Sequence, residues 1–439
     1  MATDPTRSIR AHDHPSVFDY PADELLNHLA NLPSQYEVPY LTVTLDWSVD
    51  GDNPARSAAP ATKRSQPAGE TGTDRPSLRI FEQEMNRLIE AHGPRGAAFD
   101  ALQQSKERIG TWLRDELDPA ARGVYIVAHE PSGVLDATGL NLPIETAVSL
   151  SAEPRLYNLI RIVEDYPTYA VLQIDQADAT LSFITHGARD RSVQLESTLF
   201  PRKQSSGGLN QKRYRRRAEE RMEAFARDTI AETEKALAEA GVDVLILAGN
   251  DVMINVVRNE MPDQLAGVIV DHIRMEPTVA PHEKVEMTIP IAEAAERQRE
   301  QESVDRLRNA IGAGEYGAAG PQEVLRALQN GQVETLILCD TFTGNGWADY
   351  EMHVFGVDEV PTIHPTGGEL SKLVPVDLRD EFVRLALSTG AEVDIIHSAV
   401  PVEATGVPAA GELPKSDAAT DLVEMGGVGA ILRYAITAE

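Results

Sequence analysis

The chain has 439 residues, which is too long for one ordinary hydrophobic core, so two to four domains are expected. Its 42% apolar and 25% charged residues are typical of a globular protein and argue against global disorder and against a fibrous repeat. The formal net charge of −29 argues against a protein that coats nucleic acid with its whole surface, although it leaves room for a local basic site.

Cysteine content and the length of the apolar runs indicate the compartment. Cys339 is the only cysteine, so no intramolecular disulfide can form, and a cysteine metal cluster would need other ligands. The opening stretch, MATDPTRSIRAHDHPS, lacks the apolar core of a secretory signal. The longest apolar runs, such as 244–248, are too short to span a bilayer. We therefore expect a cytoplasmic protein with no membrane partner.

The first third of the chain is predicted to hold a flexible N-terminal arm at 1–36 and then an α/β domain at 37–150. The stretch YLTVTLD at 40–46 alternates and is β-branched, as strands are. Residues 50–76 are rich in Asp, Ala, Pro, Ser and Gly, which is typical of a disordered loop. The expected helices cover 22–32, 78–91 and 99–117, and the expected strands cover 40–46, 123–129 and 133–140.

The middle of the chain, 151–283, is predicted to form a second α/β domain. After a polar loop at 201–212, a long helix is expected to run to about Ala240, where Gly241 ends it. Its apolar face has helical spacing and consists of Tyr214, Ala218, Met222, Phe225, Thr229 and Leu237. The expected strands cover 168–175, 180–186, 192–199, 242–248 and 268–270, and a further helix covers 251–258.

Residues 284–439 are predicted to form a third α/β domain. Strands and helices alternate here and in the middle segment, which indicates βαβ units and mixed or parallel sheets. No repeat with a period of 20–50 residues is present, which argues against a solenoid. The expected helices cover 287–311, 322–328 and 378–388, and the expected strands cover 333–339, 392–397 and 428–434.

Familiar catalytic and cofactor motifs are missing or stand in the wrong context. The letters GAGEYG at 312–317 match G-x-G-x-x-G, but the dinucleotide fingerprint needs a strand before it and a helix after it, and here a helix precedes and Pro321 follows. No P-loop, G-x-S-x-G or H-E-x-x-H motif occurs. The trio His12, Asp13 and His14 has no second ligand group beside it. We therefore expect no cofactor, no metal site and no self-contained catalytic constellation.

The one unusual stretch is PRKQSSGGLNQKRYRRR at 201–217, which carries seven basic residues and no acidic one. Cations at a helix N-terminus oppose the macrodipole at a cost of about 0.3–1 kcal/mol. A solvated helix end whose cations pair with Glu219, Glu220 and Glu223 is one explanation, and a polyanion partner is the other. The basic-patch criterion favours RNA or DNA binding. The candidate contact residues are Arg202, Lys203, Gly207, Gly208, Leu209, Asn210, Gln211, Lys212, Arg213, Arg215, Arg216 and Arg217.

This stretch is similar to the central-domain loop of the archaeal and eukaryotic class-1 peptide-chain release factors and of their relative Pelota. In those release factors a Gly-Gly-Gln loop precedes a long basic helix that has an Arg-aromatic pair near its start. Here Gly207 and Gly208 are in place, and Arg213 and Tyr214 fall at the matching distance.

Further stretches extend the resemblance to about 155–439. LILAGNDVMINVV at 245–257 resembles the strand-Gly-helix that follows the loop. The stretches 331–342 and 426–434 resemble the C-terminal domain of the superfamily, which is related to the ribosomal-protein L7Ae fold. The resemblance implies three α/β domains with mixed sheets, among them a central release-factor-like domain and a C-terminal L7Ae-like domain.

The N-terminal segment lacks the stop-codon-reading motifs of true release factors. The chain therefore resembles the bacterial branch of the superfamily, which includes the ribosome-hibernation factor Balon and similar mycobacterial proteins. This resemblance implies entry into the ribosomal A site during hibernation or a stalling response. It also implies contact with ribosomal RNA or tRNA, and elongation factor Tu or another translational GTPase as a partner.

Leu209 occupies the position of the catalytic Gln of the release factors. Its side chain has no hydrogen-bond donor or acceptor with which to position a water beside an ester. Losing such a positioning group can cost orders of magnitude in rate. We therefore predict binding without peptide release. Two alternatives stay open: a peptidyl-tRNA hydrolase that uses Gln211 or backbone amides, and an RNA-processing factor or interaction module that acts away from the ribosome.

Overall fold

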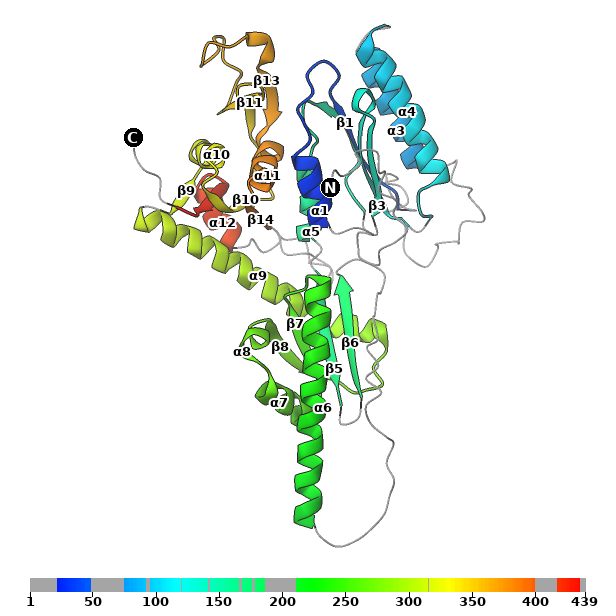
Figure 1. The fold of residues 1–439 in the computed structure, drawn as a ribbon, viewed down its shortest axis with the longest axis vertical. Coiled ribbons are helices and arrows are strands. Elements are labelled where there is room, and N and C mark those ends of the chain that lie inside the picture. The colour runs from blue at the N-terminus through cyan, green and yellow to red at the C-terminus, as the bar shows by residue number, and fades with distance from the viewer. Residues whose placement is uncertain are drawn as a thin grey trace, which may run out of the picture. The chain divides into compact units, whose positions relative to one another are not determined.

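The structure is a computed structural model, drawn in Figure 1. The predicted strand 192–199, the first part of the predicted arm and nearly all of the predicted loop 50–76 lie outside the described residues. The structure describes residues 22–48, 75–91, 95–119, 121–140, 143–165, 168–175, 178–185, 211–314, 316–398 and 417–434.

The chain forms two compact units, which are described one at a time. Unit 1 combines residues 1–165 with 300–400 and 412–439, and unit 2 consists of 166–299 and 401–411. The described residues form four sheets with helices between the strands, which confirms the mixed α/β class with several sheets. The division into domains at 37–150, 151–283 and 284–439, and the L7Ae-like character of the last one, stay predictions.

The N-terminal part of unit 1 is an antiparallel sheet in the order β3-β2-β1-β4. The alternating side chains Val43 and Leu45 of β1 pack with Phe81 and Met85 of α3 and with Ile109 of α4, so these helices cover one face of the sheet. The strands are β1 (Tyr40–Asp46), β2 (Gly123–His129), β3 (Val134–Leu140) and β4 (Ala147–Ser151), and the helices are α3 (Pro76–Ala91) and α4 (Ala97–Asp115).

The C-terminal part of unit 1 is built around the strand β10 (Val333–Cys339). Its apolar run is buried because β10 is a central strand, parallel to β14 (Glu392–Ile396) and antiparallel to β15 (Val428–Leu432). The short strand β9 (Gly317–Ala319) completes this sheet. A separate antiparallel sheet has the order β12-β11-β13, and its strands are β11 (Asn345–Asp349), β12 (Val354–Val357) and β13 (Val374–Asp377). The helices are α10 (Pro321–Gln329), α11 (Leu378–Ser388) and α12 (Asp417–Glu424).

Polar contacts join the two parts of unit 1. The Asp380 carboxylate of α11 accepts a hydrogen bond from the Tyr157 backbone N–H at 2.9 Å, and its other oxygen lies 3.3 Å from Arg155 Nη1. The Tyr36 hydroxyl, which precedes β1 in the chain, accepts a hydrogen bond from the Tyr350 N–H at 2.7 Å. Residues more than 200 positions apart in sequence are thereby brought together. The helices α1 (Ala22–Ala30) and α5 (Tyr157–Asp165) also contact α11.

Unit 2 is a mixed sheet in the order β6-β5-β7-β8, with helices on both faces. β5 is antiparallel to β6 and parallel to β7, and β7 is parallel to β8. Leu172 of β5 packs toward α6 and α7, whereas Tyr169 and Val171 face α9. The strands are β5 (Thr168–Ile174), β6 (Ala179–Thr185), β7 (Leu245–Gly249) and β8 (Ile269–Arg274), and the helices are α6 (Gln211–Ala240), α7 (Asp251–Glu260) and α8 (Asp263–Ala266). The helix α9 (Pro281–Ala313) belongs to unit 2 up to Arg299 and to unit 1 from Glu300 on.

Helix α9 begins earlier than the sequence pattern predicted. It starts at Pro281 instead of 287 and continues through Pro290, whose missing N–H leaves one helical hydrogen bond unmade. Gly314, with φ of 83°, follows the last helical residue, so the GAGEYG letters span the end of a helix as expected. Gly241, with φ of 63°, likewise ends α6, as predicted.

Gly249, the last residue of β7, makes a close approach that only glycine allows. Its φ is 149°, and a Cβ there would lie 2.1 Å from the Ile174 carbonyl oxygen of the neighbouring strand β5. We expect Gly249→Ala to reduce the free energy of unfolding by about 2–4 kcal/mol, because backbone strain and a clash with a ladder carbonyl add up. Urea unfolding followed by circular dichroism measures the change.

Gly312→Ala is the matched control for this substitution. Gly312 lies in the last turn of α9 with open space around its Cβ position, so alanine should leave stability unchanged or raise it by up to about 1 kcal/mol. Equal effects of the two substitutions would contradict the close-approach argument.

Candidate functional site

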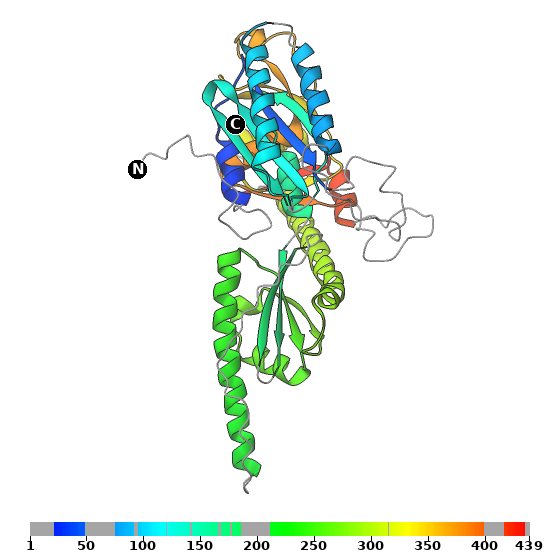
Figure 2. The same ribbon diagram turned by 90° about the vertical axis from the view of Figure 1, so that its right-hand side faces the viewer.

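Helix α6 packs on its sheet only through its second part. Phe225, Ala226 and Ile230 are buried against β5, β7 and α7, and Met222 is the first partly buried residue of this core. Glu220 and Arg221, just before it, are exposed. In Figures 1 and 2 the N-terminal end of α6 extends beyond the strands of its own sheet. The helix therefore begins well before the point where it is anchored.

The predicted RNA-binding residues fall at this end of α6 and before it. The helix begins at Gln211, inside the stretch predicted as a loop, and its first turns contain Lys212, Arg213, Arg215, Arg216 and Arg217, whose side chains lie outside the described part. The other predicted residues also lie outside it: Arg202, Lys203, Gly207, Gly208, Leu209 and Asn210. Their contacts stay predictions.

The charge at the start of α6 works against the helix. The first turn contains no acidic residue, so the partial positive charge of the helix end is met by cations. An ion pair between Arg227 and Glu260 at 2.8 Å links α6 to α7 further along, but exposed pairs of this kind contribute at most about 1 kcal/mol. The charge of the helix end thus gives no reason for basic residues in the first turn.

A polar cavity of about 300 Å³ lies in unit 2 at the carboxyl ends of β5, β7 and β8. Asn250 shapes it: its side-chain oxygen accepts the Met253 N–H at 2.9 Å and caps α7, and its amide nitrogen donates to Asp175 at 2.8 Å. Arg274 and Glu276 also line it. This edge of a parallel sheet is a common ligand position, and sequence reasoning missed it because the residues are distant in the chain.

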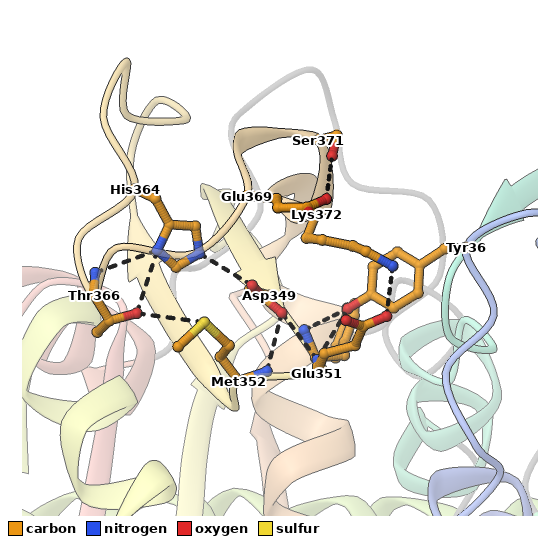
Figure 3. A network of polar contacts seen from close by, with 10 residues as sticks. Tyr36, Asp349, Glu351, Met352, His364, Thr366, Glu369, Ser371 and Lys372 are labelled. Carbon is orange, nitrogen blue, oxygen red and sulfur yellow. Dashed lines mark hydrogen bonds and ion pairs between the residues drawn. The ribbon is translucent and has the colours of Figure 1, made fainter.

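Figure 3 shows a second polar network, around the buried pair His364 and Asp349 in unit 1. Their side chains are 2% and 1% exposed, and His364 Nε2 lies 3.0 Å from the Asp349 carboxylate. The other carboxylate oxygen accepts the backbone N–H groups of Glu351 and Met352 at 2.9 and 3.0 Å. Although burial raises the pKa of Asp349, these hydrogen bonds outweigh it and hold the pKa below its ordinary value.

The network contains the residue types of a catalytic Thr-His-Asp triad, but its geometry indicates a structural role in the loop. The Thr366 N–H donates to His364 Nδ1 at 3.2 Å, which occupies the lone pair that a base would use. The Thr366 hydroxyl lies at the same distance and also approaches the Met352 sulfur. Gly368 is needed here because a Cβ would lie 2.8 Å from His364 Nε2. We infer that this pair fixes the segment between β12 and β13.

Tyr36 links the network to the N-terminal part of unit 1. Its hydroxyl accepts the N–H groups of Tyr350 and Glu351, and Lys372 Nζ lies 4.8 Å from its ring centroid (Figure 3). The Lys372 ammonium also pairs with the Glu351 carboxylate, which raises the pKa of Lys372. These contacts are structural and add no reactive group.

Two simple kinds of site are not found among the described residues. None of their His, Cys, Asp and Glu side chains form a group of three that could hold a metal ion. His12, Asp13 and His14 lie outside the described ranges. No helix in those ranges is both long and apolar enough to cross a lipid bilayer.

A family model matches the central segment of the chain. Residues 154–307 match the family described as bacterial archaeo-eukaryotic release factor family 10. This segment begins just before α5, contains the described residues of unit 2, and ends within α9. This match confirms the resemblance to the release factor and Pelota superfamily that was inferred from the Gly-Gly stretch and the basic helix.

Solved structures match the chain at low sequence identity. Archaeal Pelota, in a ribosome-bound model with ABCE1, shares 15% identity over 72% of this chain and 78% of its own, with a TM-score of 0.38. Dom34 of S. cerevisiae, described as a translation termination-like factor, shares 12% identity over 74% and 82%, with a TM-score of 0.37. Pelota of Archaeoglobus fulgidus shares 17% over 73% and 82%, with a TM-score of 0.28. No curated protein sequence matches the chain.

We expect Asp349→Ala to destabilise the β11–β13 sheet by about 2–4 kcal/mol, because His364 and two backbone N–H groups lose their acceptor. The stabilising effect of this carboxylate is present at neutral pH and is lost as pH falls through its lowered pKa. Limited proteolysis within 358–373 and urea unfolding measure the change.

Glu359→Ala removes an exposed carboxylate from the same segment and is the control. Its effect should stay within about 0.5 kcal/mol. Unchanged proteolysis of the Asp349→Ala protein would mean that the buried pair does not hold this segment.

Proposed function

We propose that the protein binds the ribosomal A site through the basic segment 201–217, as a hibernation or stalling-response factor that does not release the peptide. The observation that carries this proposal is the concentration of seven basic residues, without an acid, around the start of α6 in a chain of net charge −29. The match of 154–307 to a release-factor family supports the ribosome as the partner.

The cost of placing cations at a helix start is offset when a polyanion neutralises them. RNA phosphates release condensed counterions when they meet Lys and Arg, so seven contacts would give a log–log salt slope of about −5 to −6. The same cations without a partner oppose the dipole of α6. A polynucleotide partner therefore removes a conflict that helix stability leaves in place.

The length of α6 before its anchored part supports the proposal that its basic end enters an RNA site. The helix residues before Met222 span roughly 16 Å at 1.5 Å per residue, and the core of unit 2 begins only there. A segment presented in this way can enter a narrow RNA site while the rest of unit 2 stays outside it.

Individual residues in the segment have different proposed roles. Arg202, Lys203, Lys212, Arg213 and the arginines 215–217 contact phosphate. Gly207 and Gly208 allow backbone angles that few other residues adopt. Leu209 offers no polar group to a water nucleophile, so the peptidyl-tRNA ester stays intact. The proposed protein partner is elongation factor Tu or another translational GTPase.

The double substitution Arg215→Ala/Arg216→Ala should weaken ribosome binding and reduce the log–log salt slope by about 1.4–1.8, since two phosphate contacts are lost. Co-sedimentation with ribosomes over a potassium chloride series measures both quantities. Arg258→Ala/Arg274→Ala removes two exposed arginines elsewhere in unit 2 and should leave the slope unchanged. A wild-type protein that stays in the free fraction even at low salt would refute the ribosomal proposal.

Peptide release separates the binder from a hydrolase. We expect the wild-type protein to release labelled peptide from stalled ribosomes no faster than buffer, and Leu209→Gln to raise release at least about tenfold by restoring a polar positioning group. Release by the wild type that is lost in Gln211→Ala would support a peptidyl-tRNA hydrolase in place of the binder. Co-sedimentation of each variant confirms that release is compared at equal ribosome occupancy.

A further inference from the structure

Unit 1 contains a cavity of about 250 Å³ where its N-terminal and C-terminal parts meet. Four segments line it: the residues before β1, the end of β4 and the turn after it, β13, and α11. Its charged walls bring together side chains that are far apart in the chain, and this chemistry is unrelated to the basic segment of α6. The charged lining residues are Glu153, Arg155, Asp377, Asp380, Glu381 and Arg384.

Three of the four carboxylates in the cavity wall have an arginine partner. Arg384 pairs with Glu381, Arg155 Nη1 lies 3.3 Å from Asp380, and Asp377 forms a 2.7 Å pair with Arg379. Among the described residues no ion pair of this kind reaches Glu153. The cavity therefore holds one carboxyl group whose charge is not directly paired.

Glu153 is buried and only half satisfied. The residue is 6% exposed, and one carboxyl oxygen accepts a hydrogen bond from the Ser34 hydroxyl. The other oxygen, Oε2, is fully buried and has no hydrogen-bond partner in the described part of the chain. Arg155 Nε is a hydrogen-bond donor that is also buried and has no partner in the described part of the chain. Buried polar atoms without partners are rare and costly, so an unpaired acceptor and an unpaired donor in one cavity wall need an explanation.

We infer that this cavity is a binding site for a small primary amine that also carries a hydrogen-bond acceptor. The ammonium group pairs with the Glu153 carboxylate, and the acceptor meets the Arg155 guanidinium, since both residues line the cavity. The ligand is expected to be a cation because the unpaired Glu153 carboxylate is negative. One positive charge is enough, because only this one carboxylate lacks an arginine partner. The volume lies below the roughly 300–1,000 Å³ of drug-sized pockets, which restricts the ligand to a few heavy atoms.

Proton linkage gives this site a distinct signature. Burial raises the pKa of Glu153 to about 7. The charge of Arg384 and the Ser34 hydrogen bond lower this pKa, but the nearby Glu381 carboxylate raises it further. Tyr40 and Tyr350 also face the group, and burial keeps both phenols neutral by raising their pKa. Because an ammonium favours ionised Glu153, binding at neutral pH releases a proton, and affinity rises from about pH 6 to about pH 8.

The test compares three small probes at constant ionic strength on the full-length protein. Ethanolamine carries an ammonium and a hydroxyl, ethylene glycol lacks the ammonium, and n-propylamine lacks the acceptor. Ligand-detected NMR and thermal shift should rank ethanolamine first and show no binding of ethylene glycol. The wild-type pH profile provides a second readout that needs no substitution.

Glu153→Gln keeps the shape of the side chain and removes its charge, and it should weaken ethanolamine binding at least tenfold and abolish the pH dependence. Glu145→Gln removes an exposed carboxylate from the same segment and should bind as the wild type does. Equal binding to both variants, or equal binding of ethanolamine and n-propylamine, would mean general attraction to an acidic protein and would overturn the inference. The absence of any amine binding to the wild type would overturn it as well.

Discussion

The burial of Phe225 and Ile230 against β5 and β7 is the contact that fixes α6, and the position of the basic segment depends on it. The anchored part of the helix is remote from its charged start, so packing energy and the proposed binding chemistry occupy different stretches of one element. Such a division lets cations stand at a helix end where they are unfavourable, because the apolar contacts further along keep the helix formed. The buried hydroxyl of Thr233, which donates to the Thr229 carbonyl, is satisfied within the helix and does not disturb that packing.

The strands that sequence patterns predicted well are those with long β-branched or apolar runs. β1, β5 and β10 are central strands, so their hydrophobic character is local and visible in the sequence. The strand β11, by contrast, has the sequence NGWAD, which contains glycine and aspartate and gives no strand signal. It forms because β12 and β13 pair with it, and such pairing is a property of the folded chain.

The candidate sites also differ in whether the sequence alone could reveal them. The basic segment 201–217 lies within seventeen consecutive residues, so its charge is visible in the sequence. The pair of His364 and Asp349 spans fifteen positions, and Glu153 meets α11 only after more than two hundred residues. Neither partner of such a pair differs in sequence from an ordinary surface residue. Only the closure of unit 1 places Glu153 next to Ser34 and Arg384 and removes it from water.

Electrostatic screening relates the charge of the chain to the length of α6. At physiological ionic strength the Debye length is about 8 Å, so charges farther apart than this interact weakly. The helix residues before Met222 span roughly twice that distance. Lys212 and Arg213, at the very start of α6, therefore interact only weakly with acidic residues beyond Met222. Arg215 and Arg216, by contrast, lie three or four positions before Glu219, within the screening distance. In the proposed binding mode, the acidic remainder of the chain repels RNA that comes close to it, which favours contact through the end of the helix.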